Sequence, residues 1–142
     1  MNKYQGIITQ VESEGALSIV YVDVKGQPFS TIIIDTEESK PYLKHGTSVY
    51  VIFKETEVVL GKKVEGHISL RNKIKGNIVK IEKGVLLSKV TIESSMGNIT
   101  SIITTKSVKT IGLELDNEVQ AMIKTNEVML SPVEDGNKNT EA

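Results

Sequence analysis

The sequence predicts an all-β protein made of two tandem small barrels, each with one short helix. Three observations lead to this prediction. The chain repeats itself at an offset of 70 residues, several short segments alternate apolar with polar residues, and glycine-containing turns separate these segments. Alternation with a period of two is typical of half-buried strands, and a long internal repeat indicates one structural unit used twice.

Two blocks of sequence carry the repeat. The segment "NKYQGIITQVE" (residues 2–12) aligns with "NKIKGNIVKIE" (72–82). The segment "VYVIFKETEVVL" (49–60) aligns with "VQAMIKTNEVML" (119–130) at the same offset. Because both blocks keep their order and spacing, they indicate two copies of one unit.

The repeat fixes the expected domain boundaries. We predict a first unit over residues 1–66 and a second unit over 67–133, joined by the glycine-flanked polar stretch "GKKVEGHIS" (61–69). The remaining residues, 134–142, are polar and poor in helix formers, which predicts a disordered tail.

The first strands of the second unit follow from alternation and turns. The segment "GNIVKIEKG" (76–84) alternates apolar and polar residues, and "VLLSKVTIES" (85–94) follows a turn at Lys83 and Gly84. A second turn at "MGNIT" precedes the strand "SIITT" (101–105). These segments predict a meander of antiparallel strands.

The end of the unit departs from the strand pattern once. The segment "KSVKTIGL" (106–113) predicts a short helix, with hydroxyl residues at its start and Gly112 near its end. Two further strands, over 118–124 and 127–131, close the unit. Four or five short strands with one short helix favour a barrel of the oligonucleotide/oligosaccharide-binding (OB) type.

Composition excludes several classes of function. The chain has no cysteine and only two histidines, which argues against thiolate metal sites, disulfides and most zinc sites. Its carboxylates are scattered, so we expect no enzyme. No apolar run is long enough to cross a membrane and no secretory signal opens the chain, so we expect a cytoplasmic protein without a membrane partner.

Charge is divided unevenly along the chain. Residues 1–66 have a net charge of −2 and residues 67–131 a net charge of +3. This asymmetry favours a local anion site in the second unit. An OB-type nucleic-acid binder is a weaker alternative, because the chain has 4% aromatic residues and a total net charge of −1.

The segment "ISLRN" (68–72) contains the only arginine of the chain, Arg71. In an extended segment Ser69 and Arg71 point to the same side, so a hydroxyl and a guanidinium can face one ligand. A guanidinium offers a planar fork that suits two oxygens of an anion. Asn72 either faces away or anchors the backbone. A surface arginine in a loop is the ordinary alternative.

Hydroxyl and lysine residues later in the unit add further candidate donors. Thr104 and Ser107 flank the start of the short helix, where they either cap it or help to bind an oxyanion. Lys124, followed by Thr125, ends a strand, and Lys54 is its weaker counterpart in the first unit. A lysine at such a place is often only solvated. Taken together, these residues form a set of donors without an acid, which suits a fully ionised anion.

Three motifs in residues 68–131 resemble the Mop-type molybdate-binding unit, also called molbindin or the TOBE-like domain. A Ser-x-Arg-Asn-x-x-x-Gly motif runs from Ser69 to Gly76, and an Ile-Thr-x-x-Ser motif runs from Ile103 to Ser107. A Lys-x-x-Glu-Val-Met-Leu motif runs from Lys124 to Leu130. All three occur in the order and at the spacing of that family.

The resemblance implies paired barrels that assemble into oligomers, with a trimer of tandem units favoured. It implies molybdate or tungstate as the ligand, held at interfaces between units, and a role in molybdenum storage or homeostasis. A stand-alone sensing module that acts through a regulator or transporter is the alternative. By analogy, the ligand would contact the following residues: Ser69, Arg71, Asn72, Thr104, Ser107, Lys124 and Thr125.

The first unit departs from the motifs. It starts at Met1-Asn2-Lys3 and has no serine or arginine that corresponds to Ser69 and Arg71. Its segment "IIIDTEES" (32–39) places acids near the positions that correspond to Thr104 and Ser107. Carboxylates repel an oxyanion, so we expect no site of the same kind there.

Overall fold

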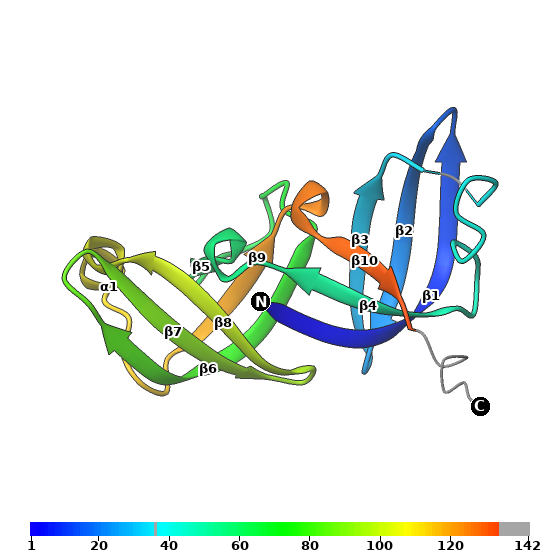
Figure 1. Cartoon of the computed structure of the whole chain (residues 1–142). Coiled ribbons are helices and arrows are strands. Elements are labelled where there is room, and N and C mark those ends of the chain that lie inside the picture. The colour runs from blue at the N-terminus through cyan, green and yellow to red at the C-terminus, as the bar shows by residue number, and fades with distance from the viewer. Residues whose placement is uncertain (36, 134–142) are drawn as a thin grey trace.

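The computed structural model describes residues 1–35 and 37–133, and it confirms the all-β prediction. Ten strands form two five-stranded antiparallel sheets, which lie side by side in Figure 1. The predicted disorder of residues 134–142 lies outside the part of the chain that the structure describes.

The first half contains five strands and one 3-10 turn. Strand alternation is visible in their burial, because every second residue of β2 is buried. The elements are β1 (Asn2–Glu14), β2 (Leu17–Val24), β3 (Gln27–Ile33), β4 (Ser48–Phe53), the 3-10 turn η1 (Glu55–Glu57) and β5 (Val59–Gly61).

The second half repeats this order and adds an α-helix. The strand predicted over 127–131 begins only at Met129, because the residues before it form a 3-10 turn. The elements are β6 (Asn72–Lys83), β7 (Leu87–Ser94), β8 (Gly97–Thr104), α1 (Thr105–Ile111), β9 (Glu118–Ile123), the 3-10 turn η2 (Thr125–Glu127) and β10 (Met129–Pro132).

A helix occurs at the predicted place only in the second unit. There α1 ends at Gly112, whose left-handed backbone (φ 76°) caps the helix as expected. The corresponding residues 37–42 of the first unit form turns, and the only helical segment in the described part of that unit is η1. Pro41 offers a physical reason, since proline lacks the N–H that a helix interior uses.

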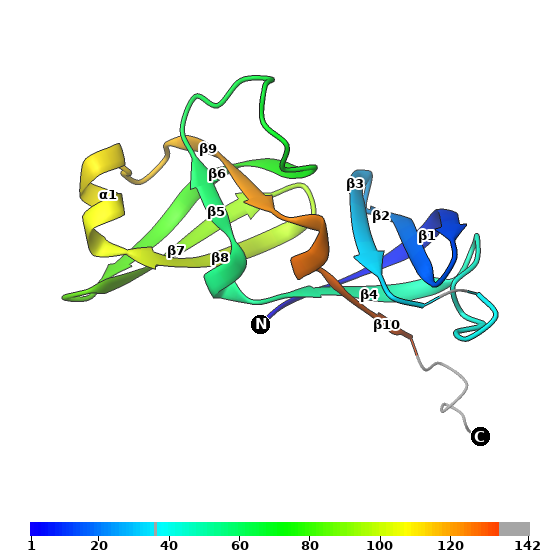
Figure 2. The same ribbon diagram turned by 90° about the horizontal axis from the view of Figure 1, so that it is seen from above.

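The two halves exchange their last strands. The strand order is β10-β4-β1-β2-β3 in one sheet and β5-β9-β6-β7-β8 in the other. Strand β5 of the first half therefore pairs with β9, and β10 of the second half pairs with β4. Figure 2 shows β10 leaving the second half and lying alongside β4. Because neither sheet is complete without a strand of the other unit, the two halves form one body.

A glycine and a bulge recur at equivalent places in both sheets. A Cβ atom on Gly76 would lie 2.5 Å from the carbonyl oxygen of Glu93, and one on Gly6 would lie 2.7 Å from that of Asp23. Two residues later, the pairing of β1 with β2 and of β6 with β7 shifts register. These shared features let the first strand of each half bend sharply across its neighbour.

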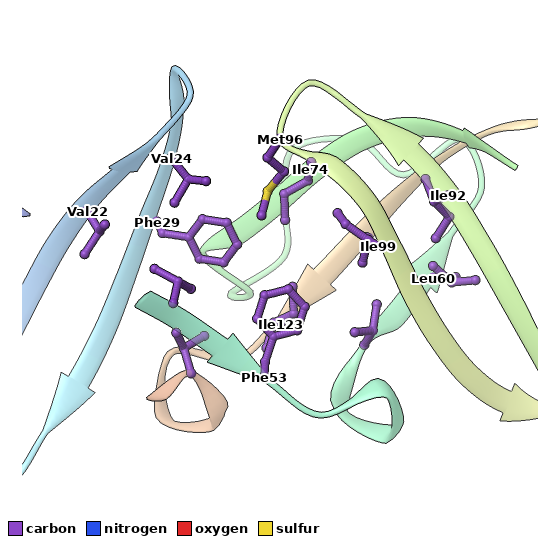
Figure 3. Packing of buried hydrophobic residues seen from close by; sticks show 14 of the residues in the cluster. Val22, Val24, Phe29, Phe53, Leu60, Ile74, Ile92, Met96, Ile99 and Ile123 are labelled. Atoms are coloured by element: carbon purple, nitrogen blue, oxygen red, sulfur yellow. The ribbon is translucent and has the colours of Figure 1, made fainter. Parts of the chain in front are cut away.

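One hydrophobic core runs through both halves. At its centre Phe53 of β4 stacks on Phe29 of β3, with ring centroids 5.9 Å apart, and Ile123 of β9 lies beside them (Figure 3). Tyr4 stacks on the same Phe53 ring with centroids 5.7 Å apart. The exchange of strands thus buries side chains from both units in a single interior.

Candidate functional site

Asn72 fastens the start of the second unit to the first. Its side chain is 1% exposed. Its Oδ1 accepts a hydrogen bond from the backbone N–H of Ser30 at 2.8 Å, and its Nδ2 donates to the carbonyls of Ser30 (2.9 Å) and Ile123 (3.1 Å). We call this region, where β6 begins beside β3 and η2, the second joint. Because these bonds occupy its amide, the Asn72 side chain anchors the backbone, which was one of the two interpretations of the sequence. The expectation from the family resemblance that this side chain contacts the ligand is corrected accordingly.

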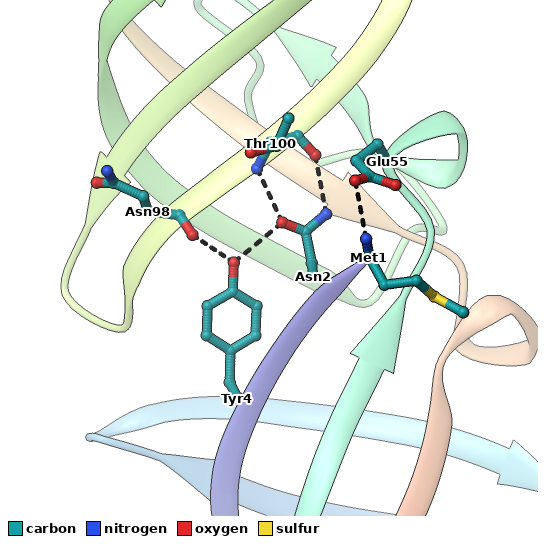
Figure 4. Close-up of polar contacts among 6 residues, drawn as sticks. All are labelled: Met1, Asn2, Tyr4, Glu55, Asn98 and Thr100. Atoms are coloured by element: carbon teal, nitrogen blue, oxygen red, sulfur yellow. Dashed lines mark hydrogen bonds and ion pairs between the residues drawn. The ribbon is translucent and has the colours of Figure 1, made fainter.

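Asn2 makes the equivalent contacts from the first unit to the second. Its Nδ2 donates to the carbonyl of Thr100 at 2.8 Å, and its Oδ1 accepts from the Thr100 N–H at 2.9 Å (Figure 4). We call this region, where β1 begins beside β8 and η1, the first joint. Buried hydroxyls follow the same pattern, since Thr31 donates to the Val128 carbonyl and Ser101 to the Val58 carbonyl. The two joints are therefore built alike.

A pocket of about 470 Å³ opens at the second joint. Arg71 and Thr125 line it from the second unit, and Tyr21 and Phe29 are among the residues that line it from β2 and β3 of the first. One wall is thus apolar and the other carries a guanidinium. The sequence repeat does not predict this apolar wall, because its side chains belong to the other unit than Arg71.

A second pocket of about 390 Å³ is lined by Ser69, Lys124 and Thr125. Thr125 lines both pockets, so it lies between three other predicted donors, Arg71 on one side and Ser69 and Lys124 on the other. The side chains of Ser69, Arg71 and Lys124 are exposed, and Thr125 is half-buried. The second joint therefore presents a hydroxyl, a guanidinium and an ammonium to an open surface.

No carboxylate neutralises these cations within residues 1–35 and 37–133. The ion pairs found there join the Met1 ammonium to Glu55 and Lys80 to Glu82. Tyr21 donates a hydrogen bond to Glu12 at 2.9 Å, which raises the pKa of Tyr21 above its usual value, while the positive charge of Arg71 opposes this rise. Arg71 is thus close enough to β2 to act on Tyr21, and it forms no ion pair among the described residues.

Thr104 and Ser107 cap α1, as the helix reading predicts. Thr104 Oγ1 accepts a hydrogen bond from the Ser107 N–H at 3.0 Å and donates to Ser107 Oγ at 2.8 Å. Helix α1 lies at the end of the second sheet that is farthest from the first sheet (Figure 1). Within one chain these hydroxyls therefore lie far from Arg71, and the predicted donors form two separate groups.

Exposed apolar side chains surround this distal group. Val85 and Leu86, at the tip of the β6–β7 hairpin, are 94% and 79% exposed. Leu87, Ile111 and Leu115 are also exposed. The Leu86 carbonyl accepts a hydrogen bond from the Thr105 N–H, so the hairpin tip and the start of α1 form one surface. We call it the distal surface. A group of exposed apolar side chains is typical of a place where another molecule docks.

Two other features, a metal site and a membrane-spanning helix, were sought in the described part of the chain. Residues 1–35 and 37–133 contain no group of three or more His, Cys, Asp or Glu side chains that could hold a metal ion. No helix among them is long and apolar enough to span a membrane.

Comparison with known proteins identifies relatives of the second unit and of longer parts of the chain. A model of the TOBE domain matches residues 68–130. The molybdenum-pterin-binding protein 1 of Clostridium pasteurianum is 44% identical over 64 residues, which are 44% of this chain and 94% of that protein. The molybdenum-pterin-binding protein MopB of Rhodobacter capsulatus is 29% identical over 109 residues, covering 75% of this chain and 40% of MopB.

A solved structure matches nearly the whole chain. The cytoplasmic molybdate-binding protein ModG, in a crystal form with molybdate bound, superimposes with a TM-score of 0.86 at 25% identity. The match covers 93% of this chain and 96% of that one, so both halves and their arrangement correspond. Together with the 94% coverage of the clostridial relative, this assigns the chain to the family of Mop-type molybdate-binding proteins.

Proposed function

We propose that the protein binds molybdate or tungstate reversibly at the second joint. The observation that carries the proposal is the cluster of Ser69, Arg71, Lys124 and Thr125 around two adjoining pockets, with no carboxylate paired to its cations among the described residues. The names of the relatives and the molybdate bound to ModG support the choice of ligand.

The chemistry of the cluster suits a tetrahedral oxyanion. The guanidinium of Arg71 can donate two parallel hydrogen bonds, and the hydroxyls of Ser69 and Thr125 can each donate one. None of these groups needs a proton from the ligand, so the cluster favours an anion that is fully ionised at neutral pH. Sulfate has the same charge and shape, so a cavity sized for the larger anion must provide the selectivity.

We propose that a second copy of the chain completes each site. Thr104 and Ser107 cannot reach the second joint of their own chain, but they can meet Arg71 of a neighbouring copy. The exposed side chains of the distal surface, Leu86 and Leu87 among them, would then cover the apolar wall formed by Tyr21 and Phe29. A head-to-tail contact forms a ring where the rotation between neighbouring copies closes, and a trimer is the ring that the family resemblance favours.

The cellular role follows from binding without chemistry. We propose that the protein stores or buffers molybdate in the cytoplasm and does not act as an enzyme, because the binding cluster consists of donors and lacks an acid or a base to move protons. The description of ModG as cytoplasmic supports this location.

Calorimetric titration with molybdate, tungstate and sulfate tests the proposal. The first two anions should give saturable heat, and sulfate should bind far more weakly. Native mass spectrometry of the same samples should show an oligomer that carries bound anions. Absence of heat with both molybdate and tungstate would refute the assignment, and a monomer that binds fully would refute the contribution of a second copy.

A further inference from the structure

The two joints share their architecture, and three of the pairs of positions at which they differ determine their balance of charge. At the offset of 70 residues, Met1 corresponds to Arg71, Glu55 to Thr125, and Lys89 to Ile19. The lysine at the end of the preceding strand is the same in both copies, as Lys54 and Lys124. The first joint therefore has a carboxylate where the second joint has a hydroxyl.

This carboxylate is already paired. Glu55 Oε2 accepts a hydrogen bond from the Met1 ammonium at 2.8 Å, which Figure 4 shows next to the contacts of Asn2. The bond from the ammonium lowers the pKa of Glu55 below its usual value, a backbone hydrogen bond adds to the effect, and the charge of Lys89 contributes further. Glu55 thus stays ionised and sits among cationic groups.

The contrast with the second joint is one of charge balance. There Arg71 takes the place of the Met1 ammonium, and Thr125 brings a hydroxyl donor instead of a carboxylate acceptor. Each joint gathers positive charge at the start of its first strand, but among the described residues only the first joint pairs that charge with a carboxylate in an ion pair. An external anion would complete the second joint and would be repelled from the first.

We propose that Glu55 is a built-in anion that fills the first joint, so that only one joint of each chain takes an external oxyanion. This inference rests on the proposed function, because it assumes that the second joint binds molybdate. It predicts the stoichiometry of one site of this type per chain, and it identifies Glu55 as the residue that sets this number.

Reciprocal substitutions test the inference. Glu55→Thr gives the first joint the hydroxyl of the second, and calorimetry with molybdate should then show an additional class of sites, up to twice the number per chain. Thr125→Glu gives the second joint a carboxylate and should weaken its molybdate affinity by about tenfold or more. Glu57→Thr is the matched control, because it removes the same charge from the same 3-10 turn, and it should leave the stoichiometry unchanged.

Thermal unfolding provides a second readout that does not depend on heat of binding. Saturating molybdate should raise the Tm of Glu55→Thr by more than it raises that of the wild type, since bound ligand stabilises the folded state. An unchanged stoichiometry in Glu55→Thr, or an equal gain in Glu57→Thr, would overturn the inference while the wild-type site stands. If neither the wild type nor Glu55→Thr binds molybdate, the proposed function and this inference fail together.

Discussion

Asn72 bonds both backbone polar groups of Ser30, accepting from its N–H at 2.8 Å and donating to its carbonyl at 2.9 Å. Ser30 lies on β3, the edge strand of the first sheet, so this amide satisfies a strand edge that would otherwise be unpaired. Asn2 does the same for Thr100 on β8, the edge strand of the second sheet. The contact between the units therefore also pairs backbone groups on one edge strand of each sheet, β3 and β8.

Replacement of Asn72 should destabilise the protein substantially. Asn72→Ala leaves the partly buried N–H and carbonyl of Ser30 without their bonds to the Asn72 amide, which costs about 2–3 kcal/mol of unfolding free energy. Urea denaturation measures this loss. Asn77→Ala is the control, because Asn77 is an exposed asparagine on the same strand, and it should change stability by less than about 0.5 kcal/mol. Equal losses in the two variants would contradict the anchoring role of Asn72.

The close crossing at Gly76 predicts a large effect of one added methyl group. In Gly76→Ala the new Cβ would lie 2.5 Å from both the Glu93 carbonyl oxygen and Ile92 Cγ2. The carbonyl belongs to a paired strand and cannot move aside, so we expect a loss of about 3 kcal/mol. Gly15→Ala, where a Cβ meets no neighbour within 4 Å, should cost less in the same denaturation experiment. A Gly76→Ala protein of wild-type stability would show that the strands are less tightly crossed.

Tyr4 should make the protein sensitive to alkaline pH. Burial raises the pKa of Tyr4 well above its usual value, and its hydroxyl donates to the carbonyl of Asn98. The unfolded chain ionises this phenol at about pH 10 and the folded protein only at higher pH, so stability falls as the pH rises above about 10. Tyr4→Phe should lose less stability between about pH 9 and 11 than the wild type, as urea midpoints at each pH will show. Parallel losses would assign the alkaline sensitivity to other groups.

A mixing experiment tests whether Arg71 and Ser107 of different copies form one site. Ser107→Ala removes the hydroxyl but keeps the N–H that bonds to Thr104, so helix α1 remains capped. Arg71→Ala and Ser107→Ala should each bind molybdate weakly on their own. When the two are co-expressed, contacts between an intact Arg71 and an intact Ser107 should restore wild-type affinity at a fraction of the sites. No recovery in the mixed oligomer would place the two residues in different sites.

Sequence alone predicts those parts of the structure that local physics determines. Alternation identifies β6 and β7, and the capping residues Thr104 and Gly112 place α1 to within one or two residues. The exchange of β5 and β10 could not be predicted, because both copies have the same strand pattern and each strand fits either sheet. The apolar wall at Tyr21 could not be predicted either, because it belongs to the other unit than Arg71. The pairing of Glu55 with Met1 follows from the pairing of β1 with β4, which the strand pattern alone does not define.

Sequence likewise identifies the donor residues of the site without showing which of them lie together. Motif spacing identifies Arg71 and Lys124, and the structure gathers them beside Thr125. Spacing does not reveal that Thr104 and Ser107 lie at the other end of the sheet, since distance along the chain says little about distance across a sheet.

The most direct test of the account is the molybdate affinity of Arg71→Ala, measured by calorimetry beside the wild type and Lys75→Ala. Lys75 is an exposed cation on β6, which begins directly after Arg71, and it lines neither pocket of the second joint, so it controls for a general loss of positive charge. We predict that Arg71→Ala loses about 2 kcal/mol, close to 30-fold in affinity, while its oligomeric mass stays unchanged and Lys75→Ala binds like the wild type. Wild-type affinity in Arg71→Ala would contradict the assignment of the second joint as the oxyanion site.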